Sequence, residues 1–341
     1  MAQGHIALGL YYNYGNHWQP DQALAEFRRA LELQPNNVQA LQLSASVHRR
    51  LGQWSLHLSE LKRCEQLDPR DPEIPVFIGA TYCRLRMWKE ANRAGQRALA
   101  LDPRNMPAIL HVLVPSFEGS GDIEKASQLL ATFPADSLIA QSFKIGGDVS
   151  NLVGNWPYFY VMKRDYAAAL KARDKDNGEP TANRLSARAA IFVLAGTASN
   201  EREEIERACA LVEARLRERP DDNYAMSQLS WIYLGLNRNA EALKVAQHLA
   251  ELVPPEKDAV IGPESLANLA EIETRTAETA EAIETLRRVL LLPAGMVASI
   301  ARLKIDPVWD PIRNDPGFQQ LLEGTELIGL PPSLTGEAAE K

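Results

Sequence analysis

Histidine and cysteine are the side chains of this sequence that could bind a metal ion or act as a nucleophile. A zinc site needs several such ligands at short, characteristic spacings. No HExxH motif, CxxC pair or other cysteine–histidine spacing of that kind occurs. We therefore expect structural or surface roles for the histidines, packing roles for Cys64 and Cys83, and no metal ion or cofactor. The six histidines are His5, His17, His48, His57, His111 and His248, and the third cysteine is Cys209.

The motifs of common enzyme classes are also missing from the sequence. It contains no GxSxG elbow, no phosphate-binding loop, and no GxGxxG segment that opens a helix after a strand. We interpret residues 119–122, Gly-Ser-Gly-Asp, as a loop between helices rather than a phosphate site. The acidic residues of 201–207 suit the first turn and the solvated face of a helix. The sequence therefore predicts that the chain is not an enzyme.

Composition and charge exclude several further classes. The 341 residues are 45% hydrophobic and 24% charged, which is typical of a folded, soluble protein. The net charge is −7 and no basic run occurs, so nucleic-acid binding is not expected. Three widely spaced cysteines indicate a reducing compartment, and no signal peptide or membrane span is recognisable. We expect a cytoplasmic protein.

Five prolines recur with a fixed interval. Pro35, Pro69 and Pro103 lie 34 residues apart, and Pro220 and Pro254 repeat that interval. Each proline follows an apolar helical stretch. Proline cannot continue a helix but starts the next one well, so it marks a boundary between helices. A fixed period of this length predicts one helix–turn–helix unit that is stacked repeatedly.

Small residues recur between the prolines at helical spacing. Ala23, Phe27 and Ala30 fall on one face of the predicted second helix of the first unit. Gly79 and Tyr82, followed by Ala91 and Ala98, occupy corresponding places in the third unit. Small side chains are needed where two helix axes cross closely.

This combination of glycine, tyrosine, alanine, phenylalanine and proline resembles the tetratricopeptide repeat family. The resemblance implies an all-α, right-handed superhelical solenoid of about eight helix pairs with a C-terminal capping helix. The expected units are residues 4–37, 38–71, 72–105, about 106–140, about 150–183, 189–222, 223–256 and 263–296. They group into an N-terminal array (1–140), an irregular repeat and joint (141–188), a C-terminal array (189–302), and a capping segment with a disordered tail (303–341).

Several positions depart from the repeat pattern. His57 stands where a small residue is expected, so the close helix crossing of the second unit is in question. The fourth unit has one extra residue near Glu118–Asp122, and Pro157 falls inside the expected first helix of the fifth. The glycine-rich joint from Ser142 to Gly154 predicts a bend in the superhelix.

The two ends of the array lead to separate expectations. The abrupt start predicts that another domain of the same polypeptide precedes the first unit, or that the chain is a fragment. In the tail, three Asp-Pro pairs at residues 306, 310 and 315 predict helix N-termini. The apolar residues that we expect to cover the last unit are Trp309, Ile312, Phe318, Leu321 and Leu322. The tail and first unit resemble repeat regions that follow a nucleotide cyclase, a serine/threonine kinase or a winged-helix regulator in bacterial signalling proteins.

The resemblance also implies where a partner would bind. In this family the first helix of each unit lines the inner groove, and its second, fifth, ninth, twelfth and thirteenth positions face that groove. Arginines at these positions in adjacent units favour an acidic or carboxylate-bearing peptide. For the aromatic cluster at residues 156–160, core packing and an exposed binding platform both remain open. The predicted partner-binding residues are Tyr12, Asn16, Gln39, Gln42, Arg49, Arg50, Arg84, Tyr158, Tyr224 and Trp231.

Two functions follow from these observations. The first is a non-catalytic interaction scaffold that holds a peptide or protein partner in its concave groove. The alternative is a regulatory or sensory module of a larger bacterial signalling enzyme or transcriptional regulator. Both share one fold, and the fold alone does not separate them.

Overall fold

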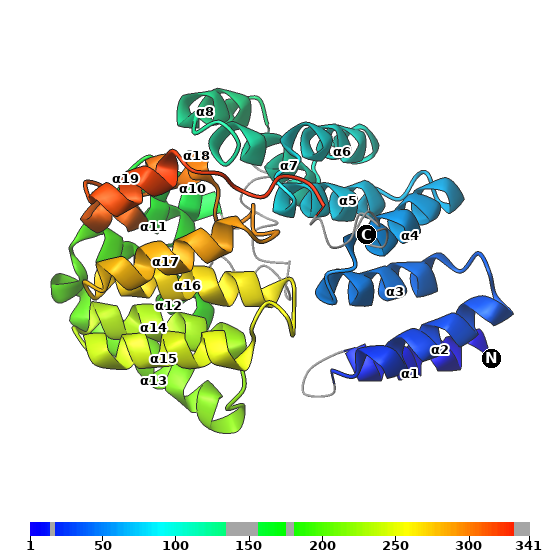
Figure 1. The fold of residues 1–341 in the computed structure, drawn as a ribbon, viewed down its shortest axis with the longest axis horizontal. Coiled ribbons are helices and arrows are strands. Elements are labelled where there is room, and N and C mark those ends of the chain that lie inside the picture. Colours follow the sequence, from blue (N-terminus) through cyan, green and yellow to red (C-terminus); the bar gives the residue numbers. More distant parts are fainter. Residues whose placement is uncertain (14–17, 134–155, 175–180, 331–341) are drawn as a thin grey trace, which may run out of the picture.

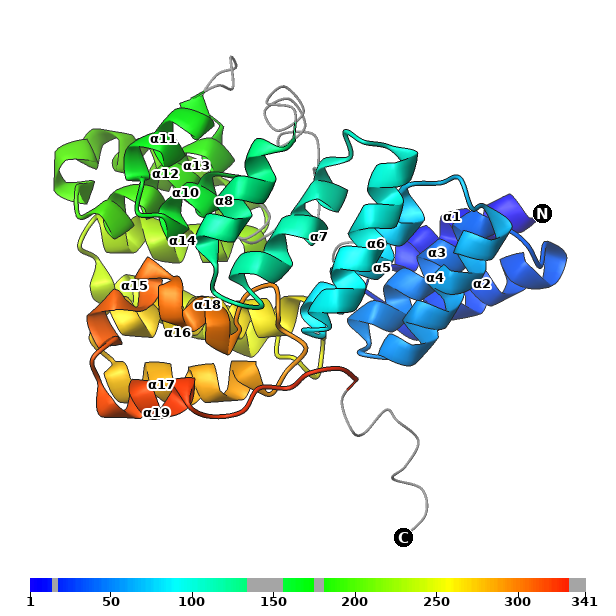
Figure 2. The same cartoon turned by 90° about the horizontal axis from the view of Figure 1, so that it is seen from above.

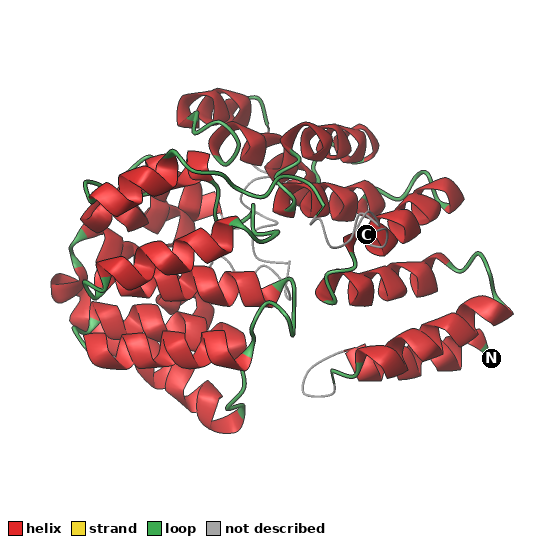
Figure 3. Cartoon of the chain, viewed as in Figure 1, coloured by secondary structure: helices red, strands yellow, loops and turns green. Residues whose placement is uncertain are grey.

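A computed structural model describes residues 1–13, 18–133, 156–174 and 181–330 of the chain. Throughout these residues the backbone forms helices joined by loops and turns, and they contain no β-strand (Figure 3). The prediction of an all-α protein is therefore confirmed. The irregular joint predicted at residues 142–154 lies outside the described residues.

The described helices form eight consecutive antiparallel pairs, each joined by a short connection (Figure 1). This arrangement confirms the predicted right-handed solenoid of tetratricopeptide-type units. The pairs are α1 (Ala2–Asn13) with α2 (Pro20–Leu33), α3 (Val38–Arg50) with α4 (Trp54–Leu67), α5 (Glu73–Arg84) with α6 (Trp88–Leu101), α7 (Met106–Phe117) with α8 (Ile123–Ala131), α10 (Trp156–Met162) with α11 (Tyr166–Asp174), α12 (Ala182–Ala195) with α13 (Arg202–Glu218), α14 (Asn223–Gly235) with α15 (Asn239–Leu252), and α16 (Ile261–Arg275) with α17 (Thr279–Leu290). A 3₁₀ turn, η3 (Ala198–Glu201), connects α12 to α13.

The repeat period also determines where the first helices begin. Asn37 and Asn105 precede α3 and α7, and the Oδ1 atom of each accepts a hydrogen bond of 3.0 Å from the backbone N–H three residues ahead. Asp222 does the same for α14, with Ala225 as the donor. Each side chain satisfies one of the backbone N–H groups that the first turn of a helix leaves without a partner. The sequence therefore restarts a helix at the same place in these units.

Small residues allow the helices of a pair to cross closely, as predicted. Ala23, Ala30, Ala91 and Ala98 are fully buried. Gly79 makes room for the next unit and not for its own partner helix, because a Cβ atom there would lie 2.7 Å from the His111 ring of that unit. The stacking of successive units therefore constrains the sequence as strongly as the pairing within a unit.

His57 does not disturb the crossing in the second unit. Its ring is buried, with Nδ1 2.8 Å from the carbonyl oxygen of Ala45 and Nε2 2.7 Å from Oγ1 of Thr81. The imidazole thus joins three helices by polar contacts where other units have only small apolar side chains. Burial lowers the pKa of His57 to about 3, so the ring is neutral at physiological pH.

Two helices differ from the predicted unit bounds. Helix α1 begins at Ala2, before the predicted start at residue 4, and Gly9 faces the Phe27 ring. Because α1 is displaced toward the N-terminus, the connection from α1 to α2 is longer than the connection from α3 to α4. Helix α12 begins at Ala182 instead of residue 189, because the Thr181 hydroxyl caps it.

The chain after the last repeat forms α18 (Ile300–Ile305), η4 (Pro307–Ile312) and α19 (Pro316–Leu322). Trp309 and Ile312 of η4 are buried, as are Phe318 and Leu321 of α19. These four side chains belong to the same apolar core as Leu286 of α17. The prediction of a segment that covers the last repeat is confirmed.

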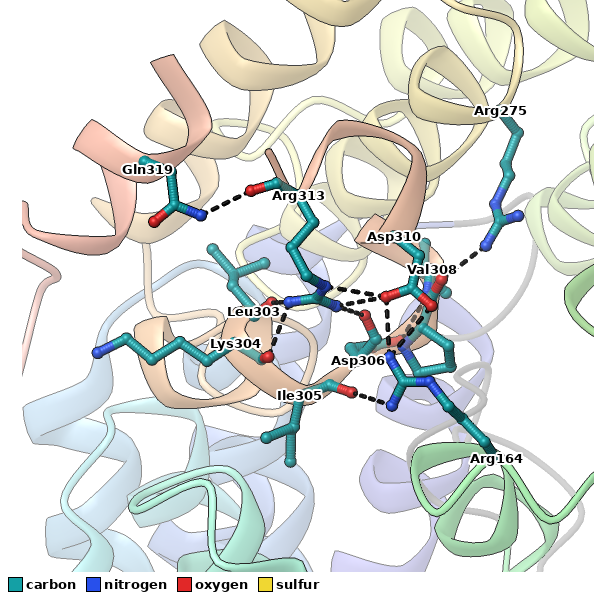
Figure 4. A network of polar contacts seen from close by, with 11 residues as sticks. Arg164, Arg275, Leu303, Lys304, Ile305, Asp306, Val308, Asp310, Arg313 and Gln319 are labelled. Carbon is teal, nitrogen blue, oxygen red and sulfur yellow. Dashed lines mark hydrogen bonds and ion pairs between the residues drawn. The ribbon is translucent and has the colours of Figure 1, made fainter. Parts of the chain in front are cut away.

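A polar network holds this cap in place (Figure 4). Arg313 donates hydrogen bonds to the carbonyl oxygens of Lys304 and Asp306, at 2.7 and 2.6 Å. Asp306 and Asp315 cap the turns that follow them, as predicted. The prediction for Asp310 was wrong, because this residue lies inside η4 and pairs with Arg164 and Arg313 instead.

Removal of residues 306–341 should make the protein self-associate. The deletion uncovers apolar side chains of α17 that η4 and α19 bury, and a large exposed apolar surface promotes association. Light scattering coupled to gel filtration measures the mass, and deletion of residues 331–341 alone is the control. A truncated protein that is as monomeric as this control at high concentration would show that the cap does not act as a cover.

Candidate partner-binding surface

Three charged residues occupy one repeat position at the C-terminal ends of consecutive inner helices. Arg50 ends α3, Arg84 ends α5 and Glu118 follows α7, so that each lies 34 residues after the one before. Each forms an ion pair with the second half of the chain. The pairs are Arg50 Nε with Asp258 Oδ2 at 2.7 Å, Arg84 Nη2 with Glu264 Oε1 at 2.6 Å, and Arg302 Nη1 with Glu118 Oε1 at 3.1 Å.

Arg50 anchors the loop before α16. Its guanidinium stacks over the Trp18 ring, 3.5 Å from the ring centroid, and donates a 3.0 Å hydrogen bond to the carbonyl oxygen of Asn13. The backbone carbonyl of Arg50 accepts a 2.8 Å hydrogen bond from the N–H of Ala259. The first, second and last repeats therefore meet at one arginine.

Arg86 is fully buried and contacts both the segment between α17 and α18 and the segment after α19. Its guanidinium donates to the carbonyl oxygens of Leu292, Ala298 and Leu327 at 2.8 to 3.2 Å. Glu326 adds a carboxylate 3.3 Å from Nε. Burial lowers the pKa of Arg86 to about 10, which leaves the side chain charged at neutral pH.

Glycine permits the backbone approach beside Arg86. The N–H of Gly295 donates a 2.9 Å hydrogen bond to the carbonyl oxygen of Arg84. A Cβ atom at position 295 would lie 2.2 Å from the carbonyl oxygen of Cys83, which is far inside van der Waals contact. Any larger residue at position 295 would therefore push the two halves of the chain apart.

Arg302 faces two buried carboxylates, one from each side of the junction. Its Nη1 atom lies 3.1 Å from Glu118, and its Nε atom lies 3.0 Å from Asp306. All three side chains are almost completely buried. Burial raises the pKa of Glu118 to about 8. The negative charge of Asp306, which shares the guanidinium of Arg302, also raises it.

We refer to the interactions of residues 50, 84–86 and 118 with residues 258–264 and 289–329 as the closure contacts. Through them the second half of the solenoid packs against the inner helices of the first half. Figure 2 shows the segment after α19 running back toward α5, where the N–H of Gly329 binds the carbonyl oxygen of Leu85 at 2.8 Å. The chain thus occupies much of its own inner surface.

The structure places half of the predicted partner-binding residues in internal contacts. Arg50 and Arg84 belong to the closure contacts. Tyr12 is half-buried against Phe27 and its neighbours in the core. Trp231 is buried and hydrogen-bonded to Glu271, and Tyr224 lies beneath the guanidinium of Arg215. Asn16 lies outside the described residues; Tyr158 belongs to α10, but its side chain also lies outside them.

Three predicted residues remain accessible on the inner face of α3. Gln39 is exposed, and Gln42 and Arg49 are half-buried. On the next inner helix Phe77 is 41% exposed, on the same face as Glu73 and Arg84 by helical spacing. We call Gln39, Gln42, Arg49 and Phe77 the inner patch. The sequence analysis did not identify Phe77, because it is the sixth residue of the unit 72–105 and not one of the positions expected to face the groove.

The described residues contain no cluster of three or more histidine, cysteine or acidic side chains that could hold a metal ion. Burial raises the pKa of Cys64 to about 11 and also raises that of Cys83, so both thiols are unreactive packing groups. Across the described part of the chain, no helix has the length and apolar character needed to cross a membrane.

These features define a tetratricopeptide-type helical solenoid. Comparison with solved structures agrees: the crystal structure of yeast Tom70 superposes with a TM-score of 0.51 at 16% identity and covers 95% of this chain and 57% of that one. PilF of Pseudomonas aeruginosa gives a TM-score of 0.41 at 18% identity, covering 66% of this chain and 94% of its own. At this identity the likeness shows the fold alone.

Sequence comparison finds a short matching segment in one curated protein. A segment of 105 residues is 33% identical to the Protein CTR9 homolog of Arabidopsis thaliana, and the match covers 30% of this chain. The chain spans only 10% of that protein's length. No family model matches the chain.

Replacement of Arg86 by glycine should destabilise the protein by about 3–5 kcal/mol, because a buried charge pair and several hydrogen bonds are lost. Arg86 has a left-handed backbone with φ of 53°, so glycine also relieves strain there. Asn237 provides the matched control, because it is exposed and has φ of 59°. Asn237→Gly should change the free energy of unfolding by less than about 1 kcal/mol in urea titrations. Equal effects of the two substitutions would contradict the role assigned to the guanidinium.

Stability should fall as pH rises from about 6.5 to about 8. Glu118 and Glu271 have pKa values raised by burial to about 8 and about 7, so in this range the folded chain binds more protons than the unfolded chain. His57 and His111, whose pKa values are lowered, act in the opposite direction only below about pH 6.5. Melting temperatures across this range, compared with those of Glu118→Gln, test the assignment. The variant should show a flatter profile, whereas a parallel profile would exclude Glu118 as a titrating group.

Proposed function

We propose that this chain is a non-catalytic interaction scaffold and that the inner patch binds a segment of a protein partner. The observation that carries the proposal is Phe77, a large aromatic side chain that is 41% exposed on an inner helix of a solenoid. Inner helices of neighbouring units form one continuous surface, so Phe77 of α5 and the α3 residues face a common space. The closure contacts use the C-terminal ends of these helices, and of the inner patch only Arg49 lies at such an end.

The chemistry of the inner patch fits a peptide rather than a small molecule. Gln39 and Gln42 each carry one donor group and one acceptor group, which match the backbone amides of an extended segment. Phe77 offers an apolar surface for one side chain of that segment. Arg49 adds a positive charge, so the preferred partner carries a carboxylate at that point.

Ion pairs within the chain reduce the number of arginines that could bind an acidic partner. Arg50 and Arg84 already bind Asp258 and Glu264, so neither is offered to an outside carboxylate in the closed chain. We expect selection of the partner to depend more on Phe77 and the two glutamines than on the net acidity of the partner.

Site-specific photo-crosslinking tests this function. A photoreactive phenylalanine analogue placed at Phe77 should capture a partner from native lysate. The same analogue at Leu101, which is 43% exposed on α6, is the matched control because exposure and repeat are the same while the helix is different. Equal capture from both positions, or none from Phe77 under conditions where intact protein retains a partner, would place the binding surface elsewhere.

A substitution pair separates recognition from folding. Phe77→Ser and Gln42→Ala alter side chains outside the closure contacts, so the melting temperature should stay within a few degrees of the parent. Capture should fall at least tenfold for the double variant, since a loss of about 1.4 kcal/mol of binding free energy has this effect. Undiminished capture by a folded double variant would contradict the proposal.

A further inference from the structure

The first helix has an uncovered apolar face. Helix α1 contains no aspartate, glutamate, lysine or arginine, and its one histidine, His5, pairs with Glu26 of α2. Gly4, Ala7, Leu8 and Tyr11 are all exposed and follow one another at spacings of three, one and three residues. This spacing places them on a single side of the helix. We call these four residues the α1 stripe; Leu8 is 48% and Tyr11 54% exposed.

Two places of this stripe are buried in the third unit. We align α1 with α5 by the glycine that each packs against another helix, Gly9 and Gly79. In this alignment Gly4 and Leu8 correspond to Ile74 and Ile78. Both isoleucines are buried, in one core cluster with Leu61 of the preceding helix α4. Gly4 and Leu8 therefore lie at stacking positions of the repeat, and among the described residues no helix covers the α1 stripe.

We propose that the α1 stripe binds the same stripe of a second copy of this chain, with the two α1 helices antiparallel about a two-fold axis. The axis passes between Ala7 and Leu8. It places Gly4 of one copy opposite Tyr11 of the other, and Ala7 opposite Leu8. Each large side chain then meets a small one, and a Cβ atom built at Gly4 meets nothing within 4 Å, so room for the tyrosine ring exists. Self-complementarity of this kind is what a two-fold interface requires.

Charge and size define the strength of this dimer. The chain has a net charge of −7, but the stripe has no charged residue, so two copies meet without local repulsion. A helix of 12 residues is about 18 Å long. It buries less than the roughly 800 Å² per partner of a standard interface. A weak dimer with a dissociation constant in the micromolar range is expected.

Sedimentation velocity over about 5–500 µM protein, a range chosen to span micromolar affinities, tests the association. The parent should change from monomer to dimer, and Leu8→Glu should remain monomeric because it places two carboxylates beside the axis. Leu101→Glu adds the same charge at a similarly exposed leucine far from α1, and it should dimerise like the parent. A parent that stays monomeric throughout, or a Leu8→Glu variant that dimerises normally, would overturn the proposal. A monomeric parent would instead assign the stripe to a helix of another protein.

Cysteine cross-linking tests the antiparallel arrangement. The three native cysteines are buried and free, so introduced thiols react without interference. A mixture of Gly4→Cys and Tyr11→Cys should form a disulfide-linked dimer under mild oxidation, and each variant alone should form much less. Preferential cross-linking of Gly4→Cys with itself would show a parallel pair and contradict the antiparallel arrangement.

Discussion

The closed form of this solenoid depends on the hydrogen bonds and the ion pair of the buried Arg86 guanidinium. A charge without solvent must be surrounded by acceptors, because its desolvation costs several kcal/mol. The acceptors come from three carbonyl groups in residues 292–327 and from Glu326, all of them distant in sequence. The position is left-handed, a conformation that favours glycine and that Gly52 occupies one repeat earlier. The chain accepts backbone strain at Arg86, and the contacts across the junction offset it.

Closure changes which part of the inner surface is available. The C-terminal ends of α3, α5 and α7 meet acids, carbonyls and one arginine of the second half, whereas the N-terminal parts of α3 and α5 keep exposed side chains. A partner that binds the inner patch therefore contacts only the part of the inner surface that the second half of the chain does not cover. Because Arg49 and Arg50 are adjacent on α3, recognition and closure share one helix, and a change in either can alter the other.

The helix pairs could be predicted from the sequence, but their closure could not. A 34-residue period in Pro35, Pro69 and Pro103 is a local signal, repeated often enough to define helix boundaries and the crossing alanines. The partners of Arg50 and Arg84 are Asp258 and Glu264, which have no counterpart in other repeats and lie about two hundred residues away. The sequence indicated that these arginines would meet carboxylates; the carboxylates proved to belong to the same chain. For a similar reason the sequence did not show how His57 fits the repeat. Its ring binds the carbonyl oxygen of Ala45, a contact that exists only in the folded chain.

Hydrogen exchange at three backbone amides tests closure most directly. The N–H groups of Ala259, Gly295 and Gly329 lie in loops and donate to the carbonyl oxygens of Arg50, Arg84 and Leu85 in the first half. If the chain is closed in solution, these amides should exchange far more slowly than unprotected loop amides, because their exchange requires the halves to separate. Exchange at the rate of unprotected loop amides, while the amides inside α3 and α5 remain protected, would show an open solenoid and contradict the account.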